Sequence, residues 1–277
     1  MKKLLTSLLA LMLTFVTAFT FASCGDTEGG NADDGIVDVR TKTITVGYTD
    51  YAPMNYTDDK GTLVGFDTEL ALMVFNSLGY EVRFKLIEWG NKYSELNSGT
   101  IDCIWNGFTA NAEDEGTPRS EIVDFTYYYM QNAQCIIRKN GTTNVNSLDE
   151  LEGKSVSFEA GSAGQSYVEG ITANILQKPV TSQMDAVKEV NMGTSDYAVV
   201  DILLAESLAG QNDYADIVIN EGIEIPVEYY AVGFKKGSEL TQKVNAMFEA
   251  YAKIGYLNEL AEKYGLETKV LTDFDAE

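Results

Sequence analysis

The sequence predicts an α/β fold built as two lobes of related topology. Short runs rich in β-branched and aromatic residues alternate with amphipathic helical stretches, which is typical of parallel sheets with helices on their faces. The order of these elements repeats in the second half of the chain. Similar tetrapeptides, Gly-Thr-Ile-Asp at 99–102 and Gly-Thr-Ser-Asp at 193–196, occupy the same relative place in both halves. The alternation and the repeat together favour two lobes over one large domain.

The first half of the chain contains the first series of elements. Residues 43–48 predict a strand, and a helix follows with Asp67 as its N-cap and Gly79 at its end. Three further elements complete the series: a strand at 82–86, a helix at about 90–98 and a strand at 101–105.

The second half repeats this order. We expect a strand at 154–158, helices at about 166–177 and 185–192, and a strand at 196–200. The chain then ends in helices from about 239 to 264, broken near Gly255.

The N-terminal segment predicts secretion. Lys2 and Lys3 precede an apolar stretch from 4 to 21, which is typical of a signal peptide over residues 1–23. An uncleaved membrane anchor is the alternative, since a spanning helix needs about 20 apolar residues. The cysteine after Ala-Ser resembles the bacterial lipobox, with Phe21 where that pattern prefers leucine, and implies that Cys24 carries a lipid. Residues 24–41 are rich in glycine and acidic residues and predict a flexible acidic tether.

Composition excludes several classes of function. The net charge of −22 would repel phosphate backbones, so we expect no nucleic-acid partner. The absence of histidine excludes Ser-His-Asp and Cys-His catalysis and most zinc sites. We expect no cofactor and no metal. Cys103 and Cys135 lie in apolar strand-like runs and are either buried free thiols or a disulfide.

The loops after the strands are the place to expect a ligand. In open α/β sheets ligands bind beyond the carboxyl ends of the strands, and pockets concentrate between lobes. The candidate segments are residues 49–54, 87–89, 106–119 and 159–165, together with Asp201.

These segments resemble the bacterial polar-amino-acid binding proteins (solute-binding protein family 3), the substrate-binding subunits of ABC importers. The resemblance runs from about residue 43 to 265 and depends on several motifs in family order. They are Tyr-Ala-Pro-Met at 51–54, Leu-Val-Gly-Phe-Asp at 63–67, Leu-Asn-Ser-Gly-Thr-Ile-Asp at 96–102, Arg119 with Ile-Val-Asp-Phe-Thr at 122–126, Ser-Leu-Asp-Glu-Leu-Glu-Gly-Lys-Ser-Val at 147–156, Val-Val-Asp at 199–201 and Gly-Tyr-Leu at 255–257.

The resemblance implies a type II periplasmic-binding-protein fold, with parallel or mixed sheets and a two-segment hinge near Arg138 and Ala231. Lobe 1 would comprise residues 42–137 and 231–277, and lobe 2 residues 138–230. The implied protein is an extracytoplasmic, lipid-anchored monomer that closes around a free amino acid by hinge motion. It would deliver a polar amino acid, with cationic and cystine-like side chains among the options, to an ABC permease and its ATPase.

The resemblance also implies how the two ends of the amino acid are held. Arg119 matches the family arginine that grips the α-carboxylate, for which a guanidinium fork is suited, although a surface arginine is the alternative. Thr109 and Gly107 would complete that clamp, and the connection at 111–118 is longer than is usual in the family. Asp201 matches the carboxylate that holds the α-ammonium, with a helix N-cap as the alternative.

Further positions follow from the same resemblance. Ser162 and Ala163 match a lobe 2 loop whose backbone N–H groups meet the carboxylate at a helix start. Tyr51 and Trp89 match the walls of the pocket, with core packing as the alternative. Asp50 and Glu159 would lie near the ligand side chain, where two acids suit a cationic group; solvated surface acids are the alternative.

Two other classes of function remain open at this point. A dehydratase-like enzyme on the same fold would need a general acid or base in the cleft, whereas the cleft acids here already have binding roles. A sensor module would normally be fused to a spanning helix and a signalling domain, which we do not expect here.

Overall fold

The computed structural model describes residues 42–274, so the predicted signal peptide, Cys24 and the whole tether lie outside the described residues. The described residues group into one unit. No helix between residues 42 and 274 combines the length and the apolar character that crossing a bilayer requires.

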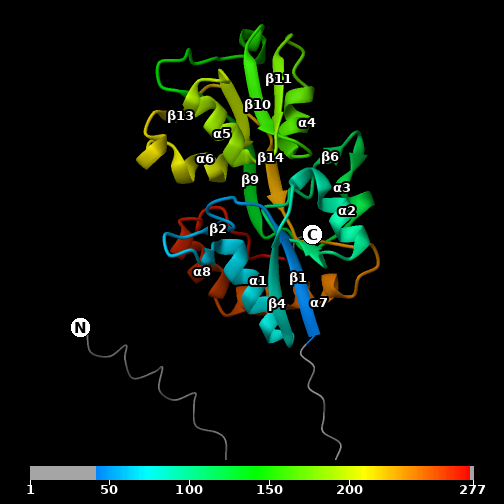
Figure 1. Ribbon diagram of the computed structural model, residues 1–277. Coiled ribbons are helices and arrows are strands. Elements are labelled where there is room, and N and C mark those ends of the chain that lie inside the picture. The colour runs from blue at the N-terminus through cyan, green and yellow to red at the C-terminus, as the bar shows by residue number, and fades with distance from the viewer. Residues whose placement is uncertain (1–41, 275–277) are drawn as a thin grey trace, which may run out of the picture. The chain divides into compact units, whose positions relative to one another are not determined.

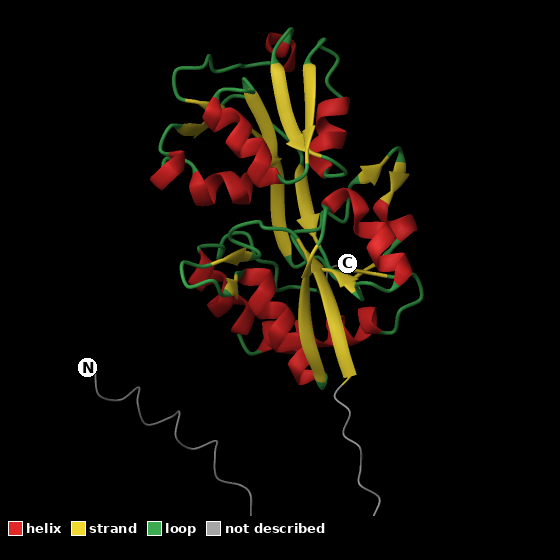
Figure 2. Cartoon of the chain, viewed as in Figure 1, coloured by secondary structure: helices red, strands yellow, loops and turns green. Residues whose placement is uncertain are grey.

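We define lobe 1 as the part of the chain that is built on a five-stranded mixed sheet (Figures 1 and 2). Its strands run in the order β4 (Tyr80–Leu86), β1 (Lys42–Tyr48), β5 (Cys103–Ile104), β15 (Gly233–Phe234) and β8 (Asp124–Phe125). β1 pairs in parallel with β4 and β5, while β15 pairs antiparallel with β5 and β8. The sheet packs against α1 (Phe66–Ser77) and α7 (Leu240–Lys253), and α8 (Tyr256–Tyr264) packs on these two helices.

Short elements surround the carboxyl ends of these strands. They are β2 (Tyr56–Thr57), β3 (Leu63–Val64), η1 (Trp89–Asn91), α2 (Lys92–Ser98), the hairpin of β6 (Glu113–Asp114) and β7 (Thr117–Pro118), and α3 (Arg119–Ile122). The β6–β7 hairpin accounts for the long connection at 111–118.

Lobe 2 is the part built on the second mixed sheet. Its strands run in the order β11 (Leu176–Val180), β10 (Ser155–Glu159), β12 (Tyr197–Asp201), β9 (Met130–Lys139) and β13 (Ile217–Ile219). The other elements are α4 (Ala163–Glu169), α5 (Gln183–Met192), α6 (Ile202–Leu208), η2 (Leu148–Leu151) and η3 (Asn212–Tyr214).

The central strand β12 shows why helices cover both faces of this sheet. Successive side chains of a strand point to opposite faces, and the run from Tyr197 to Val200 is apolar throughout. Tyr197 and Val199 pack in one buried cluster with Val168 of α4, while Ala198 and Val200 pack in another with α5. A continuous apolar run therefore predicts a strand that is buried on both sides.

Two antiparallel strands, β9 and β14 (Val227–Tyr230), connect the lobes (Figure 1). Residues 130–133 of β9 pair with β14, and residues 134–138 pair with β12 inside lobe 2. The predicted lobe limits, 42–137 with 231–277 and 138–230, stay a prediction. From the pairing we propose that the chain first crosses from lobe 1 to lobe 2 near Ala133 instead of near Arg138.

Two predictions about helices are wrong. Asp67 does not cap α1: the N-cap position is Gly65, and no side chain caps this end. The helix expected at 166–177 ends at Glu169, and residues 176–180 form β11. Ser162 fixes the start of α4 by accepting a hydrogen bond from the N–H of Gln165 at 3.1 Å. Pro179 fits β11 because this strand lies at the edge of the sheet.

Two other sequence features have clear outcomes. The break near Gly255 is confirmed, since this residue adopts a φ of 80° between α7 and α8. Cys103 and Cys135 are both buried free thiols and belong to different sheets, on β5 and β9.

Candidate functional site

A small pocket lies between the lobes, with room for roughly one water molecule. Both lobes line it: Trp89, Asn106, Gly107, Thr109 and Arg119 come from lobe 1, and Glu159, Ser162, Ala163, Gln183 and Asp201 from lobe 2. All the predicted ligand residues except Asp50 and Tyr51 are in this set.

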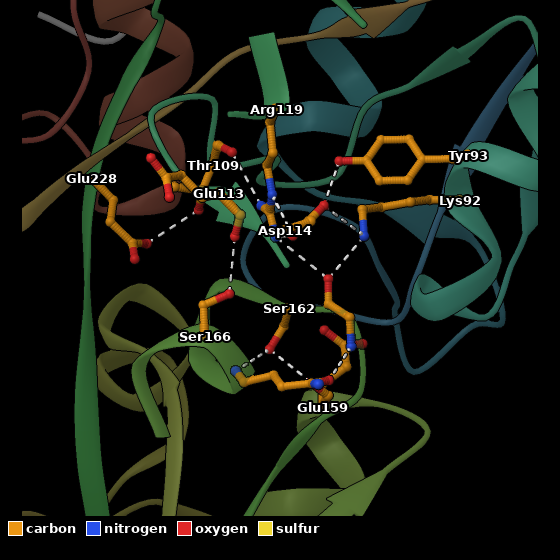
Figure 3. A network of polar contacts seen from close by, with 12 residues as sticks. Lys92, Tyr93, Thr109, Glu113, Asp114, Arg119, Glu159, Ser162, Ser166 and Glu228 are labelled. Atoms are coloured by element: carbon orange, nitrogen blue, oxygen red, sulfur yellow. Dashed lines mark hydrogen bonds and ion pairs between the residues drawn. The ribbon is translucent and has the colours of Figure 1, made fainter. Parts of the chain in front are cut away.

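Arg119 begins α3 directly after the β6–β7 hairpin and is only 1% exposed. Its Nε and Nη2 donate to Oδ1 of Asp114 at 3.0 and 2.7 Å (Figure 3). Nη1 donates to the carbonyl of Thr109 at 3.1 Å, and Nη2 also reaches the carbonyl of Gly161 at 3.4 Å. The surface-arginine alternative is therefore wrong.

The hairpin residue Asp114 holds Arg119 within a small polar network. Tyr93 donates to Oδ2 of Asp114 at 2.5 Å, and the Lys92 amine lies 3.7 Å from the same oxygen. Burial raises the pKa of Asp114, but the charges of Arg119 and Lys92 outweigh it and leave the pKa below its usual value. Burial, and next the charge of Arg119, lowers the pKa of Lys92 to about 8. The extra residues of this connection thus supply a carboxylate that fixes the guanidinium.

Asp201 lies at the carboxyl end of β12 and has three amide donors. Its Oδ1 accepts from Asn132 at 2.8 Å and Gln134 at 2.5 Å, and its Oδ2 accepts from Gln183 at 2.5 Å. Asp201 occupies the N-cap position of α6, but its side chain makes no capping hydrogen bond. The carboxylate is thus oriented by β9 and α5 and not by the helix that follows it.

The same two amides of β9 also hold a second carboxylate, Glu228 of β14. Its Oε2 accepts from Asn132 at 3.1 Å, from Gln134 at 2.9 Å and from the Thr109 hydroxyl at 3.1 Å. Burial, and next the charge of Asp201, raises the pKa of Glu228 to about 7. Burial likewise raises the pKa of Asp201. Two acids and two amides therefore form one network at the crossing strands.

Glu159 ends β10 and is 3% exposed, so the surface alternative is wrong for this residue. Among the residues that the structure describes, none donates a hydrogen bond to its Oε1. Burial, and next the charge of Asp201, raises the pKa of Glu159 to about 8. Asp50, in contrast to Glu159, is exposed and does not line the pocket.

The two predicted aromatic walls have different surroundings. Trp89 is buried, lines the pocket and packs edge-on against Phe108 at 5.3 Å between ring centres. Tyr51 is also buried, but its hydroxyl lies 2.6 Å from that of Tyr230. A Cβ at Gly107 would lie 2.5 Å from Cε1 of Tyr51, so this ring packs directly behind the pocket wall.

Four amide side chains of the site were not among the predicted ligand residues, nor were Asp114 and Glu228. Asn106 and Gln183 line the pocket, and Asn132 and Gln134 orient Asp201. Asn106 lies in the candidate segment 106–119 and opens the loop after β5, but it was not singled out as a ligand residue. Asn132 and Gln134 could also be recognised in the sequence. They are two amides at positions i and i+2, which lie on one face of a strand, and the strand continues as an apolar run.

Direct contacts join the lobes beside the pocket. The Lys92 amine donates to the carbonyl of Gly161 at 2.8 Å. The Ser166 hydroxyl of α4 donates to the carbonyl of Glu113 in the β6–β7 hairpin at 3.0 Å (Figure 3). The polar network around Arg119 thus extends from lobe 1 to lobe 2.

Comparison with known proteins finds relatives along almost the whole chain. The arginine-binding extracellular protein ArtP of Bacillus subtilis (strain 168) is 27% identical over 267 residues, which cover 95% of this chain and 98% of that protein. The L-cystine-binding protein TcyJ of Escherichia coli (strain K12) is 28% identical over 241 residues, which cover 84% of this chain and 87% of that protein.

Solved structures and a family model agree with these relatives. The structure of an ancestral arginine-binding protein bound to arginine has a TM-score of 0.74 and 31% identity, over 82% of this chain and 99% of that chain. This likeness confirms the predicted two-lobed α/β fold. The model of the bacterial extracellular solute-binding proteins, family 3, matches residues 44–267. The chain therefore belongs to family 3 of the bacterial extracellular solute-binding proteins.

Proposed function

We propose that this protein binds a free amino acid between its lobes and delivers it to the permease and ATPase of an ABC importer. One observation carries the proposal: Arg119 of lobe 1 and Asp201 of lobe 2 line the same buried pocket. A guanidinium suits a carboxylate, and a carboxylate suits an ammonium. The amino-acid-binding relatives support the same class of ligand.

The hydrogen bonds of Arg119 leave room for a ligand carboxylate. A guanidinium has five N–H groups, and the four bonds described above engage one N–H group each. The remaining N–H is on Nη1, and the weakest of the four bonds is the 3.4 Å contact from Nη2 to Gly161. In our proposal the α-carboxylate accepts from Nη1 and Nη2, while Asp114 keeps its hold on Nε and Nη2.

Binding would stabilise the closed arrangement of the lobes. A ligand shifts such an equilibrium only as far as it binds one state better than the other. A solute that bridges Arg119 and Asp201 contacts both lobes at once and therefore favours closure about the strands β9 and β14. The protein would act as a monomer and as a binding protein, not as an enzyme.

The N-terminal part of the proposal concerns how the protein is held at the membrane. We propose cleavage after Ser23, a lipid on Cys24 and a tether up to residue 41. Cys24→Ala should release the protein into the medium, whereas the unchanged protein should sediment with membranes. Sedimentation of the variant with membranes would contradict the lipid anchor.

Calorimetry with purified protein, stripped of carried-over ligand by unfolding and refolding, tests the binding function. The ligands are the common L-amino acids and cystine. We expect one or a few to bind at a ratio of one to one. Arg119→Lys keeps the charge but loses the fork, and Asp201→Asn keeps the shape but loses the charge. Each should weaken binding about tenfold to a hundredfold, as expected for a charged hydrogen bond.

Exposed residues provide matched controls for these variants. Arg83 lies in a surface ion pair with Glu81, and Asp59 is exposed, so Arg83→Lys and Asp59→Asn should leave binding unchanged. Circular dichroism should show that all variants fold. Failure of the folded protein to bind any amino acid, or turnover of a prephenate-like substrate, would contradict the proposal.

A further inference from the structure

One carboxylate of the pocket has an oxygen that accepts no hydrogen bond from any described residue. Glu159 is 3% exposed and lines the pocket, and no residue in the described part of the chain donates to its Oε1. A buried polar atom without a hydrogen bond costs free energy, and a buried charge without a partner costs more. An oxygen of this kind in a ligand pocket indicates that the ligand itself supplies the donor.

The neighbouring cations do not fill this role. Lys92 and Arg119 are the basic groups whose charges act on Glu159. The Lys92 amine donates to the carbonyl of Gly161 at 2.8 Å and lies 3.7 Å from Asp114. Arg119 is paired with Asp114 at 2.7 Å. Within residues 42–274, no lysine or arginine forms an ion pair with Glu159.

Acidic groups also outnumber basic groups around the pocket in the described part of the chain. Asp201 and Glu228 share the amides of Asn132 and Gln134, and in the described residues neither acid pairs with a cation. The α-ammonium of an amino acid would satisfy Asp201. The carboxylate of that amino acid would be directed to Arg119. An amino acid with an uncharged side chain therefore has no second positive group to offer Glu159.

We propose that the solute is a cationic amino acid whose side-chain ammonium or guanidinium donates to Oε1 of Glu159. The inference rests on the amino-acid-binding function proposed above and assigns a side-chain subsite within it. An amide side chain would supply a donor but no charge. An anionic side chain would add another carboxylate to a pocket that already contains two acids.

Calorimetry with wild type and Glu159→Gln tests this subsite, because glutamine keeps the shape and removes the charge. The ligands are L-arginine, L-lysine, L-glutamine and L-glutamate. Wild type should bind arginine or lysine at least tenfold more tightly than glutamine. Glu159→Gln should weaken the cationic ligand about tenfold to a hundredfold and change glutamine binding less than threefold. Glu224→Gln removes the same charge from an exposed site and should leave the preference unchanged.

The possible outcomes separate this inference from the proposed function. Binding of no amino acid would overturn the proposed function itself. A wild type that prefers glutamine or glutamate would overturn the cationic subsite alone, whatever the variant does. Equal weakening of all ligands in a folded Glu159→Gln variant would show that Glu159 holds the α-ammonium, which also overturns the subsite.

Discussion

At the scale of single residues, Gly107 is the position where the backbone of the site is most constrained. Its φ is +55°, and an added Cβ would lie 2.5 Å from Cε1 of Tyr51 and 3.0 Å from Cε2 of Tyr230. Gly107→Ala should therefore lower the free energy of unfolding by about 2–4 kcal/mol, through left-handed strain and steric overlap together. Urea unfolding measures this change.

Gly99 provides the matched control for Gly107. Its φ is +76°, but an added Cβ would meet no atom within 4 Å. Gly99→Ala should therefore lower the free energy of unfolding by only about 1–2 kcal/mol, the cost of the left-handed conformation. Equal losses in the two variants would show that Tyr51 and Tyr230 yield to the new methyl group.

The site also shows what single residues reveal before a structure is known. Motifs in family order identified Arg119 and Asp201, which do line one pocket. They could not reveal that Asn132 donates to Asp201 across 69 positions of sequence, because that contact depends on how β9 and β12 pair. The burial of Glu159 depends on the packing of both lobes, so the motifs could not predict it either.

At the scale of elements, the same limit explains the error at α4. Residues 166–177 contain enough apolar side chains to suit a helix, but Leu176–Val180 pairs in parallel with β10 over its whole length. Tertiary pairing outweighs a weak local preference there. The elements with strong periodicity or a fully apolar run, such as β1, α7 and β12, were predictable because their local pattern and their burial agree.

The contact between α4 and the β6–β7 hairpin leads to a prediction about closure. Ser166→Ala removes one hydrogen bond between the lobes, from its hydroxyl to the carbonyl of Glu113. Such a bond contributes about 0.5–1.5 kcal/mol. If the ligand binds the closed form, affinity should fall about twofold to tenfold for every ligand, with unchanged preference among them. Calorimetry with two ligands measures both quantities.

Ser98→Ala is the control for this contact, because the hydrogen bonds of Ser98 with other described residues stay within lobe 1, to Glu95 and Thr100. It should leave ligand affinity unchanged. A changed preference in Ser166→Ala would mean that α4 acts on the pocket and not on closure. Wild-type affinity in that variant would mean that the other contacts between the lobes suffice.

At the scale of the whole molecule, buried acids should govern how stability depends on pH. Burial raises the pKa of Asp67 to about 7, of Glu159 to about 8 and of Glu228 to about 7. In the unfolded chain these groups return to ordinary values near 4. Between about pH 5 and 8 the folded protein therefore binds more protons than the unfolded chain.

This difference fixes the sign of the dependence: the free energy of unfolding should fall as pH rises from about 5 to 8. Self-repulsion from the net charge of −22 acts in the same direction. Below about pH 4 stability should fall again, since pairing and hydrogen bonding lower the pKa values of Asp114 and Asp196. Urea unfolding of the ligand-free protein at several pH values should thus show a maximum near pH 5.

Two triple variants separate the buried groups from the net charge. Asp67→Asn, Glu159→Gln and Glu228→Gln together should flatten the dependence between pH 5 and 8, because they remove the groups whose pKa values are raised. Glu121→Gln, Glu224→Gln and Glu262→Gln change three exposed acids and should keep most of the slope. If both triple variants flatten the pH dependence equally, repulsion between surface charges dominates the loss of stability between pH 5 and 8. If wild type becomes more stable toward pH 8, these three acids are not held protonated by burial.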